Sequence, residues 1–178
     1  MTDLAREYGE GLYELCHEEH LSADVLEQMQ MLKTCFRAEP DFLRLLSNMA
    51  ISKEERCRII DKSLRGQVHQ YVLNFLKILC EKNLLHTFYG CEEAYRALYN
   101  RDHAIMEASV FTAVALSDDQ RSQLKARLKI MTGRDIHLKE SVDTHLIGGM
   151  LLEMDGKRYD NTLRHRLDEL QALLSGNK

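Results

Sequence analysis

Residues 145–174, HLIGGMLLEMDGKRYDNTLRHRLDELQALL, determine how we expect the second half of the chain to fold. The segment opens with Gly148 and Gly149, where the backbone can bend or approach another element closely. Residues 150–154 form an apolar run of strand length, and the following Asp155-Gly156 is typical of a hairpin turn. Residues 157–159 can return as the second strand. The sequence therefore predicts a β-hairpin.

An amphipathic helix is expected directly after this hairpin. The side chains of residues 160–162 can cap its first turn. Its apolar positions recur at i, i+4, i+7 and i+11, so they form one stripe that faces a core: Leu163, Leu167, Leu170 and Leu174. The segment contains no paired catalytic groups.

These residues resemble the C-terminal signature of the delta subunit of F-type ATP synthase. The mitochondrial counterpart of that family is the oligomycin-sensitivity-conferring protein. The shared order is Ile-Gly-Gly, an apolar strand, an Asp-Gly turn, Asp-x-Thr and Arg-x-Arg-Leu, and the matching residues are Ile147, Gly148, Gly149, Asp160, Thr162, Arg164, Arg166, Leu167 and Leu170. The family usually has Ser in place of Thr162 and often has Pro in place of Thr144.

Length and composition bound the class of protein. A chain of 178 residues fits one domain or two small ones, and its 44% apolar and 29% charged residues are ordinary for a soluble globular protein. A net charge of -4 argues weakly against general nucleic-acid binding. The longest apolar run, residues 146–152, is far shorter than the roughly 20 residues of a membrane span. The N-terminus has neither an apolar signal region nor the character of a transit peptide, which predicts a bacterial cytoplasmic protein.

The cysteines and the proline add two expectations. The five cysteines are odd in number and lack C-x-x-C spacing, which indicates reduced, partly buried thiols at Cys16, Cys35, Cys57, Cys80 and Cys91. The single proline, Pro40, suits a chain rich in helices.

The first hundred residues predict six successive helices with short connections, and hence a bundle. The expected caps and stops are Ser22 for the second helix, Pro40 at the start of the third (residues 41–46), and Ser52 and Gly66 for the fourth. The expected apolar stripes are Leu4, Tyr8, Leu12 and Leu15; Val25, Met29, Leu32 and Phe36; Ile59, Ile60 and Leu64, which are expected to face inward; and Phe88, Cys91, Tyr95 and Leu98.

The fifth helix, expected over residues 68–82, is apolar around an unusually wide arc of roughly 220°. Two interpretations remain open. The helix is either central and surrounded by the other five, or one of its edges is a groove for a partner's amphipathic helix. In the first helix, Gly9 and Gly11 each weaken the helix by up to ~1 kcal/mol relative to Ala. They permit close packing, either with a partner helix or inside the bundle.

The resemblance to the delta subunit extends to this half of the chain. Residues 8–13, YGEGLY, are similar to the family's opening motif, and residues 74–79, NFLKIL, to its Asn-Phe-Leu motif on the fifth helix. Family members often have Pro near Met49 and Arg near Leu84. The resemblance implies that the first and fifth helices bind a partner helix through Tyr8, Gly11, Leu12, Leu15, Asn74, Phe75 and Ile78.

Beyond a polar break at residues 100–103 the hydrophobic period changes. Residues 105–116 predict a strand with one face formed by Met106, Ala108, Val110, Thr112 and Val114. A capping box at residues 117–120 opens a helix that contains Leu124, Leu128 and Met131 and ends at Gly133. A further strand alternates through Ile136, Leu138 and Val142. The outline β-α-β-β-α predicts a small mixed α/β domain, so the expected fold class is α+β, with domains at residues 1–102 and 103–178.

Candidate chemical sites are few. Cys16 and His20 are four residues apart and could share a helix face as metal ligands do, but no second cluster supplies further ligands and a solvated helix end is the favoured interpretation. No G-x-G-x-x-G, Walker-type or G-x-S-x-G motif is present, so no cofactor is expected. The basic cluster Arg158, Arg164, His165 and Arg166 suits an anion or nucleic acid, although a charged helix face or an acidic protein partner is favoured.

The resemblance implies a non-catalytic stator subunit of an F-type proton-transporting ATP synthase. Residues 1–102 would bind the N-terminal helix of an alpha subunit of the catalytic head. Residues 103–178 would bind the b subunits of the peripheral stalk, on the cytoplasmic side of a bacterial plasma membrane. No metal, cofactor or nucleic acid is expected. The rival hypothesis is a free-standing regulatory module that binds protein, or nucleic acid through residues 158–166.

Overall fold

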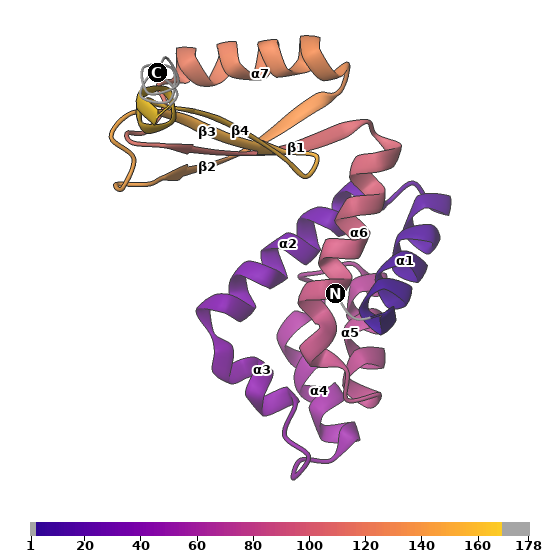
Figure 1. The fold of residues 1–178 in the computed structure, drawn as a ribbon. Coiled ribbons are helices and arrows are strands. Elements are labelled where there is room, and N and C mark those ends of the chain that lie inside the picture. Colours follow the sequence, from indigo (N-terminus) through magenta and orange to yellow (C-terminus); the bar gives the residue numbers. More distant parts are fainter. Residues whose placement is uncertain (1–2, 169–178) are drawn as a thin grey trace. The chain divides into compact units, whose positions relative to one another are not determined.

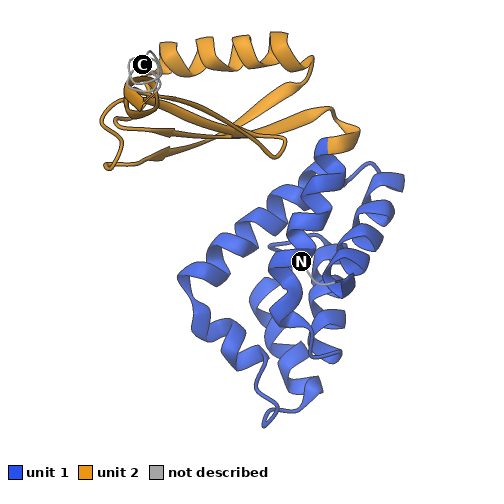
Figure 2. Cartoon of the chain, viewed as in Figure 1, with its two compact units in different colours: residues 1–100 blue, residues 101–178 orange. Residues whose placement is uncertain are grey.

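The computed structural model describes residues 3–168, which divide into two compact units with a boundary between Asn100 and Arg101 (Figure 2). The first unit is helical and the second contains a four-stranded sheet, so the predicted α+β fold class is confirmed. Within these residues, no helix is long and apolar enough to cross a membrane.

The described part of the first unit contains the six predicted α-helices and one short 3-10 helix, η1 (Figure 1). The elements are α1 (Asp3–Glu18), α2 (Ser22–Ala38), α3 (Pro40–Leu46), α4 (Lys53–Leu64), α5 (Gln70–Glu81), η1 (Leu85–Thr87) and α6 (Phe88–Asp102). The stripe predicted for α2 is confirmed, because all four of its apolar side chains are buried. The stripes of α4 and α6 are also confirmed, with Ile59 and Leu98 only partly buried at their edges.

The apolar stripe expected on α1 is only partly buried. The buried face consists of Ala5, Gly9, Leu12, Tyr13 and Cys16. Leu4 and Leu15 are instead 47% and 42% exposed. The helix therefore has two apolar faces, one packed into the bundle and one at the surface. Small residues on the buried face allow a neighbouring helix to come close, and spacing alone favoured the face with the larger side chains.

The N-cap predicted at Ser22 is also wrong, whereas the one at Ser52 is confirmed. Leu21 occupies the N-cap position of α2, and Ser22 is already its first, buried residue. The reason is a tight connection from α1, in which His20 adopts a left-handed φ of 59°. At α4, the Ser52 hydroxyl accepts a hydrogen bond from the backbone N–H of Glu55 at 3.2 Å.

The predicted start of α3 and the predicted end of α4 are confirmed. Pro40 is the first residue of α3, where its missing N–H leaves no helical bond unmade. After α4 ends at Leu64, Gly66 turns the chain with a φ of +80°, a conformation that favours glycine.

Helix α5 is the central helix of the first unit. It contacts α1, α2 and α4, and its buried side chains are Val72, Leu73, Phe75, Leu76, Leu79 and Cys80. It is shorter than predicted because His69 is its N-cap, with Nδ1 accepting a hydrogen bond from the backbone N–H of Tyr71 at 3.2 Å. The central position accounts for most of the wide apolar arc. One edge nevertheless stays at the surface, where Ile78 is 43% exposed.

The second unit is a mixed sheet covered on one face by a helix (Figure 1). Its elements are β1 (Ile105–Thr112), α7 (Asp118–Thr132), β2 (Asp135–Val142), β3 (Gly149–Met154) and β4 (Lys157–Thr162). The strand order is β2-β1-β3-β4, with β1 parallel to β2 and the other pairs antiparallel. A small core joins the sheet to α7 through Ala108, Val110, Leu128, Leu152 and Met154.

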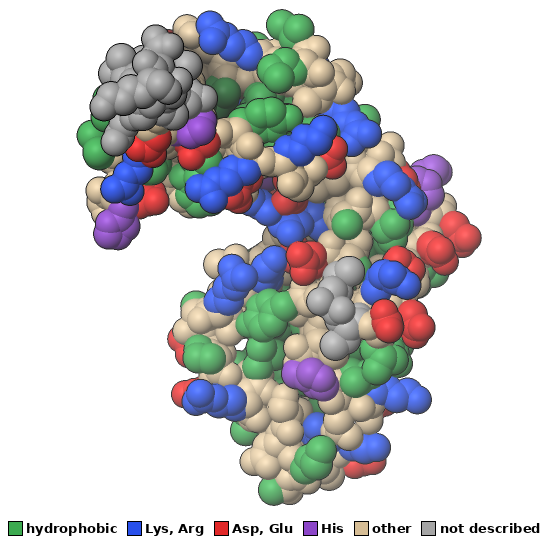
Figure 3. Space-filling model, viewed as in Figure 1, with side chains coloured by type: hydrophobic (Ala, Val, Ile, Leu, Met, Phe, Trp, Pro, Cys, Tyr) green, Lys and Arg blue, Asp and Glu red, His purple; other side chains and the backbone are tan. Residues whose placement is uncertain are grey.

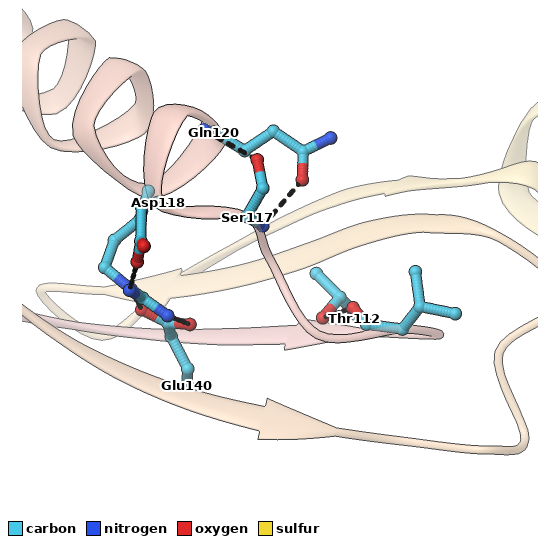
Figure 4. A network of polar contacts seen from close by, with 7 residues as sticks. Thr112, Ser117, Asp118, Gln120 and Glu140 are labelled. Atoms are coloured by element: carbon cyan, nitrogen blue, oxygen red, sulfur yellow. Dashed lines mark hydrogen bonds and ion pairs between the residues drawn. The ribbon is translucent and has the colours of Figure 1, made fainter.

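Helix α7 is held at both ends as predicted, and Figure 4 shows the hydrogen bonds at its start. The Ser117 hydroxyl accepts the backbone N–H of Gln120 at 3.2 Å, and the Gln120 side-chain oxygen accepts the backbone N–H of Ser117 at 3.0 Å. At the other end Gly133 adopts the left-handed conformation. Arg121 of α7 donates to Glu140 of β2, which ties the helix to the edge of the sheet.

The first strand is shorter than the expected residues 105–116, and three apolar residues of the expected patterns lie at the surface. Val114 is 74% exposed because β1 ends at Thr112, whose hydroxyl donates to the Val114 carbonyl at 2.7 Å as the chain turns away. Met131 and Val142 lie near the ends of α7 and β2 and are 69% and 54% exposed. The outline β-α-β-β-α undercounts the strands, because β3 and β4 are separate strands of the hairpin.

The predicted hairpin is confirmed, with a longer second strand than expected. Residues 160–162 belong to β4, and helical residues follow from 163 to 168. Leu163 and Leu167 were expected to face a core but are 45% and 60% exposed. Leu170 and Leu174, the other two members of that stripe, lie outside the described residues.

Candidate partner-binding groove

A groove of about 420 Å³ lies at the surface of the first unit between α1 and α5. All seven residues predicted to bind a partner helix line it, together with Glu7 and Tyr71. The full lining is Glu7, Tyr8, Gly11, Leu12 and Leu15 of α1, and Tyr71, Asn74, Phe75 and Ile78 of α5. Two segments about sixty residues apart in the chain thus contribute one continuous, mostly apolar surface.

The two glycines of α1 have different surroundings, which explains how the helix can serve both the bundle and the groove. A Cβ added at Gly9 would lie 2.5 Å from the carbonyl oxygen of Cys91 and 2.8 Å from Cβ of Ala94. Gly9 therefore permits the close approach of α6. A Cβ added at Gly11 would meet nothing within 4 Å. Gly11 opens the floor of the groove, and no packing inside the bundle requires it.

The groove side of α5 is rigidly positioned. Phe75 is only 5% exposed, so its ring belongs to both the core and the groove wall. The rings of His69 and Tyr71 meet edge to face, 4.9 Å apart, at the start of the helix. One turn later, Asn74 Oδ1 accepts a hydrogen bond from Gln70 Nε2 at 2.8 Å, which orients the Asn74 amide. These contacts hold the wall in place before any partner binds.

The lining is mostly apolar and suits the binding of another apolar surface. Glu7 is the one charged side chain among the described residues that line the groove. Exposed apolar side chains such as Leu15 and Ile78, at 42% and 43%, gain from being covered by another apolar surface.

The possible ligand pair Cys16 and His20 is not brought together on one helix face. Helix α1 ends at Glu18, and the Cys16 thiol is buried in the bundle core, where burial raises its pKa. The segment is therefore not simply a solvated helix end, as favoured from the sequence. Among residues 3–168, no group of three or more His, Cys, Asp or Glu could hold a metal ion.

The glycines of the C-terminal signature serve close packing at the end of the hairpin. Gly149 has a φ of +83°, and a Cβ there would lie 2.3 Å from the carbonyl oxygen of Asn161. A Cβ at Gly148 would lie 2.7 Å from Cδ1 of Leu163, whose backbone N–H donates to the Gly148 carbonyl at 3.0 Å. Both glycines therefore allow β3 to lie against the junction between β4 and the helical residues after it.

The polar signature residues form that junction. Thr162 Oγ1 accepts the backbone N–H of His165 at 3.3 Å and so caps the helical residues, as predicted for this segment. Asp160 Oδ1 accepts the backbone N–H of Thr162 at 3.0 Å, and hydrogen bonds from Thr162 lower the pKa of Asp160. Arg166 donates from Nε and a terminal nitrogen to Asn161 Oδ1 at 3.0 and 2.8 Å.

The remaining signature and basic residues are at the surface. Ile147 is 72% exposed, and Arg158 and Arg164 are also exposed. Leu170 lies outside the described residues. Because Arg166 is engaged with Asn161, the basic cluster is in part a structural feature of the junction. Acidic and basic side chains are interspersed across the visible face in Figure 3, in keeping with the modest net charge.

Sequence reasoning missed two groove residues, Glu7 and Tyr71. Tyr71 belonged to the wide apolar arc of the fifth helix, and it lies three residues before Asn74 on the same helical face. That spacing was sufficient to predict that Tyr71 lines the groove. Glu7 is an ordinary exposed acid by sequence, and only the position of α5 shows that it borders the groove.

The two units together define a class of α+β protein: a helical bundle with an apolar surface groove, followed by a small mixed sheet with a helix on one face. Residues 4–174 match the family model described as ATP synthase delta (OSCP) subunit. The chain belongs to this family, and family members are subunits of the ATP synthase complex.

Individual relatives agree with this assignment. The chain is 31% identical over 172 residues to ATP synthase subunit delta of Alkaliphilus oremlandii, with 97% of this chain and 96% of the relative covered. It is 26% identical over 174 residues to ATP synthase subunit delta of Clostridioides difficile, with the same coverage. A chain in the cryo-EM structure of the Toxoplasma gondii mitochondrial ATP synthase hexamer shares the fold, with a TM-score of 0.73, 19% identity and 97% and 98% coverage.

Proposed function

We propose that this subunit is a non-catalytic stator adapter that links the catalytic head of the ATP synthase to its peripheral stalk. The helical unit binds the N-terminal amphipathic helix of an alpha subunit in the groove between α1 and α5. The second unit binds the b subunits. The chain reaches a bacterial plasma membrane only through the complex, on the cytoplasmic side.

The groove is the observation that carries this proposal. An amphipathic helix needs an apolar channel with neighbouring helices as walls, and the surface between α1 and α5 has that form. The surrounding contacts are formed without a partner, so binding costs little reorganisation. The seven residues implied by the family resemblance all contribute to this one surface.

A stator requires two joints in series and resistance to rotor torque, with no need for turnover. Each joint can have modest affinity if the head and the stalk are also connected elsewhere, because tethering raises the effective concentration of the second binding partner. The division into two units supports this arrangement, since each unit has its own core and can present its own binding surface.

The direct test is binding of the alpha-subunit N-terminal segment to the full chain. A synthetic peptide of that segment is titrated into isotope-labelled protein while amide NMR shifts are recorded. We expect saturable shifts at Gly11, Asn74 and their neighbours, and no comparable shifts on the sheet. An affected surface elsewhere, or the absence of binding at millimolar peptide, would reject the groove as the head-binding site.

A functional test addresses the stator role itself. Co-purification from membranes should recover the chain with alpha and b subunits together. Cells that lack the chain should hydrolyse ATP without coupled proton transport. A tightly coupled synthase assembled in its absence would refute the proposal.

A further inference from the structure

The lining residues of the groove follow the same spacing on both walls. On α1, Tyr8, Gly11, Leu12 and Leu15 stand at i, i+3, i+4 and i+7. On α5, the positions Tyr71, Asn74, Phe75 and Ile78 repeat that pattern. Four residues at this spacing surround one hole on a helix surface, and such a hole accepts a single side chain of a facing helix. Each wall therefore presents one complete socket.

Two such sockets side by side specify the form of the occupant. On each wall, the first and last residues are seven positions apart, which corresponds to about 10 Å, or two helical turns. A helix lying between the walls can place one side chain in each socket when the two are three or four residues apart. An extended strand alternates its side chains between opposite faces and cannot fill both sockets in this way.

The two sockets differ in depth and polarity. The α1 socket has no side chain at Gly11, and a Cβ there would still be in open space, so the socket accepts a large apolar side chain. The α5 socket contains Asn74, whose Oδ1 is engaged by Gln70 and whose Nδ2 carries two N–H donors. A helix that covers Asn74 must supply an acceptor, because a covered polar group without a partner costs free energy.

The rim adds a charge preference. Glu7 is exposed on α1 and borders the groove beside Tyr8. Glu14 is exposed one heptad further along the same helix, so this rim is acidic. A cation on the flank of a docked helix would face Glu7, and an anion there would be repelled.

We propose that the groove binds its partner as the third helix of a short three-helix coiled coil, with recognition set by three features of that helix. These are a large apolar side chain for the Gly11 socket, a hydrogen-bond acceptor opposite Asn74, and a Lys or Arg beside Glu7. The inference rests on the proposed function, in which the occupant is the alpha-subunit helix, and it specifies the chemistry by which this chain selects that helix.

The test uses the full chain and a fluorescently labelled, hydrocarbon-stapled helical peptide as the probe. The parent peptide carries Leu for the α1 socket, Gln opposite Asn74, and Lys on the flank facing Glu7. Three peptide variants replace the Lys by Glu, the socket Leu by Ala, or the Gln by Leu. Dissociation constants are measured by fluorescence anisotropy at low and high salt.

Glu7→Gln should raise the dissociation constant of the Lys peptide roughly 2- to 5-fold at low salt, which is the usual contribution of an exposed ion pair. The effect should shrink at high salt. The matched control is Glu27→Gln, the same charge change at an exposed position on α2, outside the groove. Asn74→Leu should reverse the preference for the Gln peptide over its Leu variant. The Ala peptide should bind more than about 10-fold more weakly than the parent.

The inference is overturned if Glu7→Gln and Glu27→Gln have equal effects, or if Asn74→Leu leaves the peptide preference unchanged. It is also overturned if light scattering shows a dimer that the parent peptide dissociates, because the groove would then be occupied by a second copy of the chain. The alpha-subunit segment provides a separate arm. If the alpha-subunit segment does not bind while the stapled peptides bind as expected, the proposed function is refuted. The proposed way in which the groove recognises a helix would then still hold.

Discussion

Two alanine substitutions in α1, only two residues apart, are expected to change stability in opposite directions. Replacing glycine by alanine inside a helix normally stabilises it by about 1 kcal/mol. At Gly11 that gain is realised, because the added methyl group enters open space. We therefore expect Gly11→Ala to raise the free energy of unfolding of the helical unit by up to ~1 kcal/mol.

At Gly9 the same gain is outweighed by steric overlap. The methyl group would lie 2.5 Å from the backbone oxygen of Cys91, and backbone cannot move aside as a flexible side chain can. Overpacking of this kind costs typically 1–3 kcal/mol and occasionally more. Because both helices α1 and α6 would have to separate, we take the upper end of that range. Gly9→Ala is then expected to destabilise the unit by about 1–2 kcal/mol after the propensity gain.

Thermal unfolding followed by tyrosine signals measures this difference. The chain has no tryptophan, and six of its seven tyrosines lie in the helical unit, so near-ultraviolet circular dichroism reports mainly on that unit. A change of 1 kcal/mol shifts the melting temperature of a unit of this size by roughly 4–8 °C. Gly9→Ala should therefore melt about 10 °C or more below Gly11→Ala. Equal melting temperatures, or a lower one for Gly11→Ala, would refute the assignment of the two glycines to packing and groove.

Three further outcomes are expected. Gly11→Asp should leave the bundle folded but uncouple ATP hydrolysis from proton transport in membrane vesicles. The reason is that a carboxylate buried under an apolar partner helix disfavours binding of that helix. Full coupling would reject the groove as the binding site. Gly149→Ala should destabilise the second unit by roughly 3 kcal/mol or more, since a Cβ would lie 2.3 Å from the carbonyl oxygen of Asn161. Faster amide hydrogen exchange in β3 and β4 should reveal this loss of stability. The Arg121 hydrogen bond lowers the pKa of Glu140, so this pair stabilises the unit above the ordinary carboxyl pKa and is lost as pH falls through the lowered value. Glu140→Gln should accordingly flatten the acid limb of the stability profile of this unit, and an unchanged limb would contradict the assignment.

The parts of the fold that the sequence predicted well are those in which one local signal dominates. Helix α2 has a single apolar stripe, and all of it is buried. The capping box at Ser117 and Gln120 and the C-cap at Gly133 depend on hydrogen bonds between residues close in the chain. These hydrogen bonds form as expected at both ends of α7. Local hydrogen bonds and one-sided hydrophobic patterns need no knowledge of the partner element.

The parts that were wrong depend on which surface a neighbour covers. Helix α1 has two apolar faces, and only the position of α6 decides that the face with Gly9 is buried. Strand β1 ends before Val114 because the chain turns toward α7, which alternation alone does not reveal. Ser22 has the right side chain for a cap, yet the left-handed turn at His20 starts α2 one residue earlier.

The seven groove residues were implied by the resemblance to the delta-subunit family, whereas the wide apolar arc of the fifth helix and the glycines of the first left packing inside the bundle equally open. In the structure, several of these residues depart from the rules that govern the rest of the bundle. Leu15 and Ile78 are more than two-fifths exposed although both are strongly apolar. Gly11 lowers helix stability by up to ~1 kcal/mol without relieving any contact in the bundle. Residues that weaken a fold locally, with no compensation inside it, are expected where a binding partner supplies the missing contacts. Because the three lie on facing walls of one cavity, a single helix placed between α1 and α5 accounts for all of them at once.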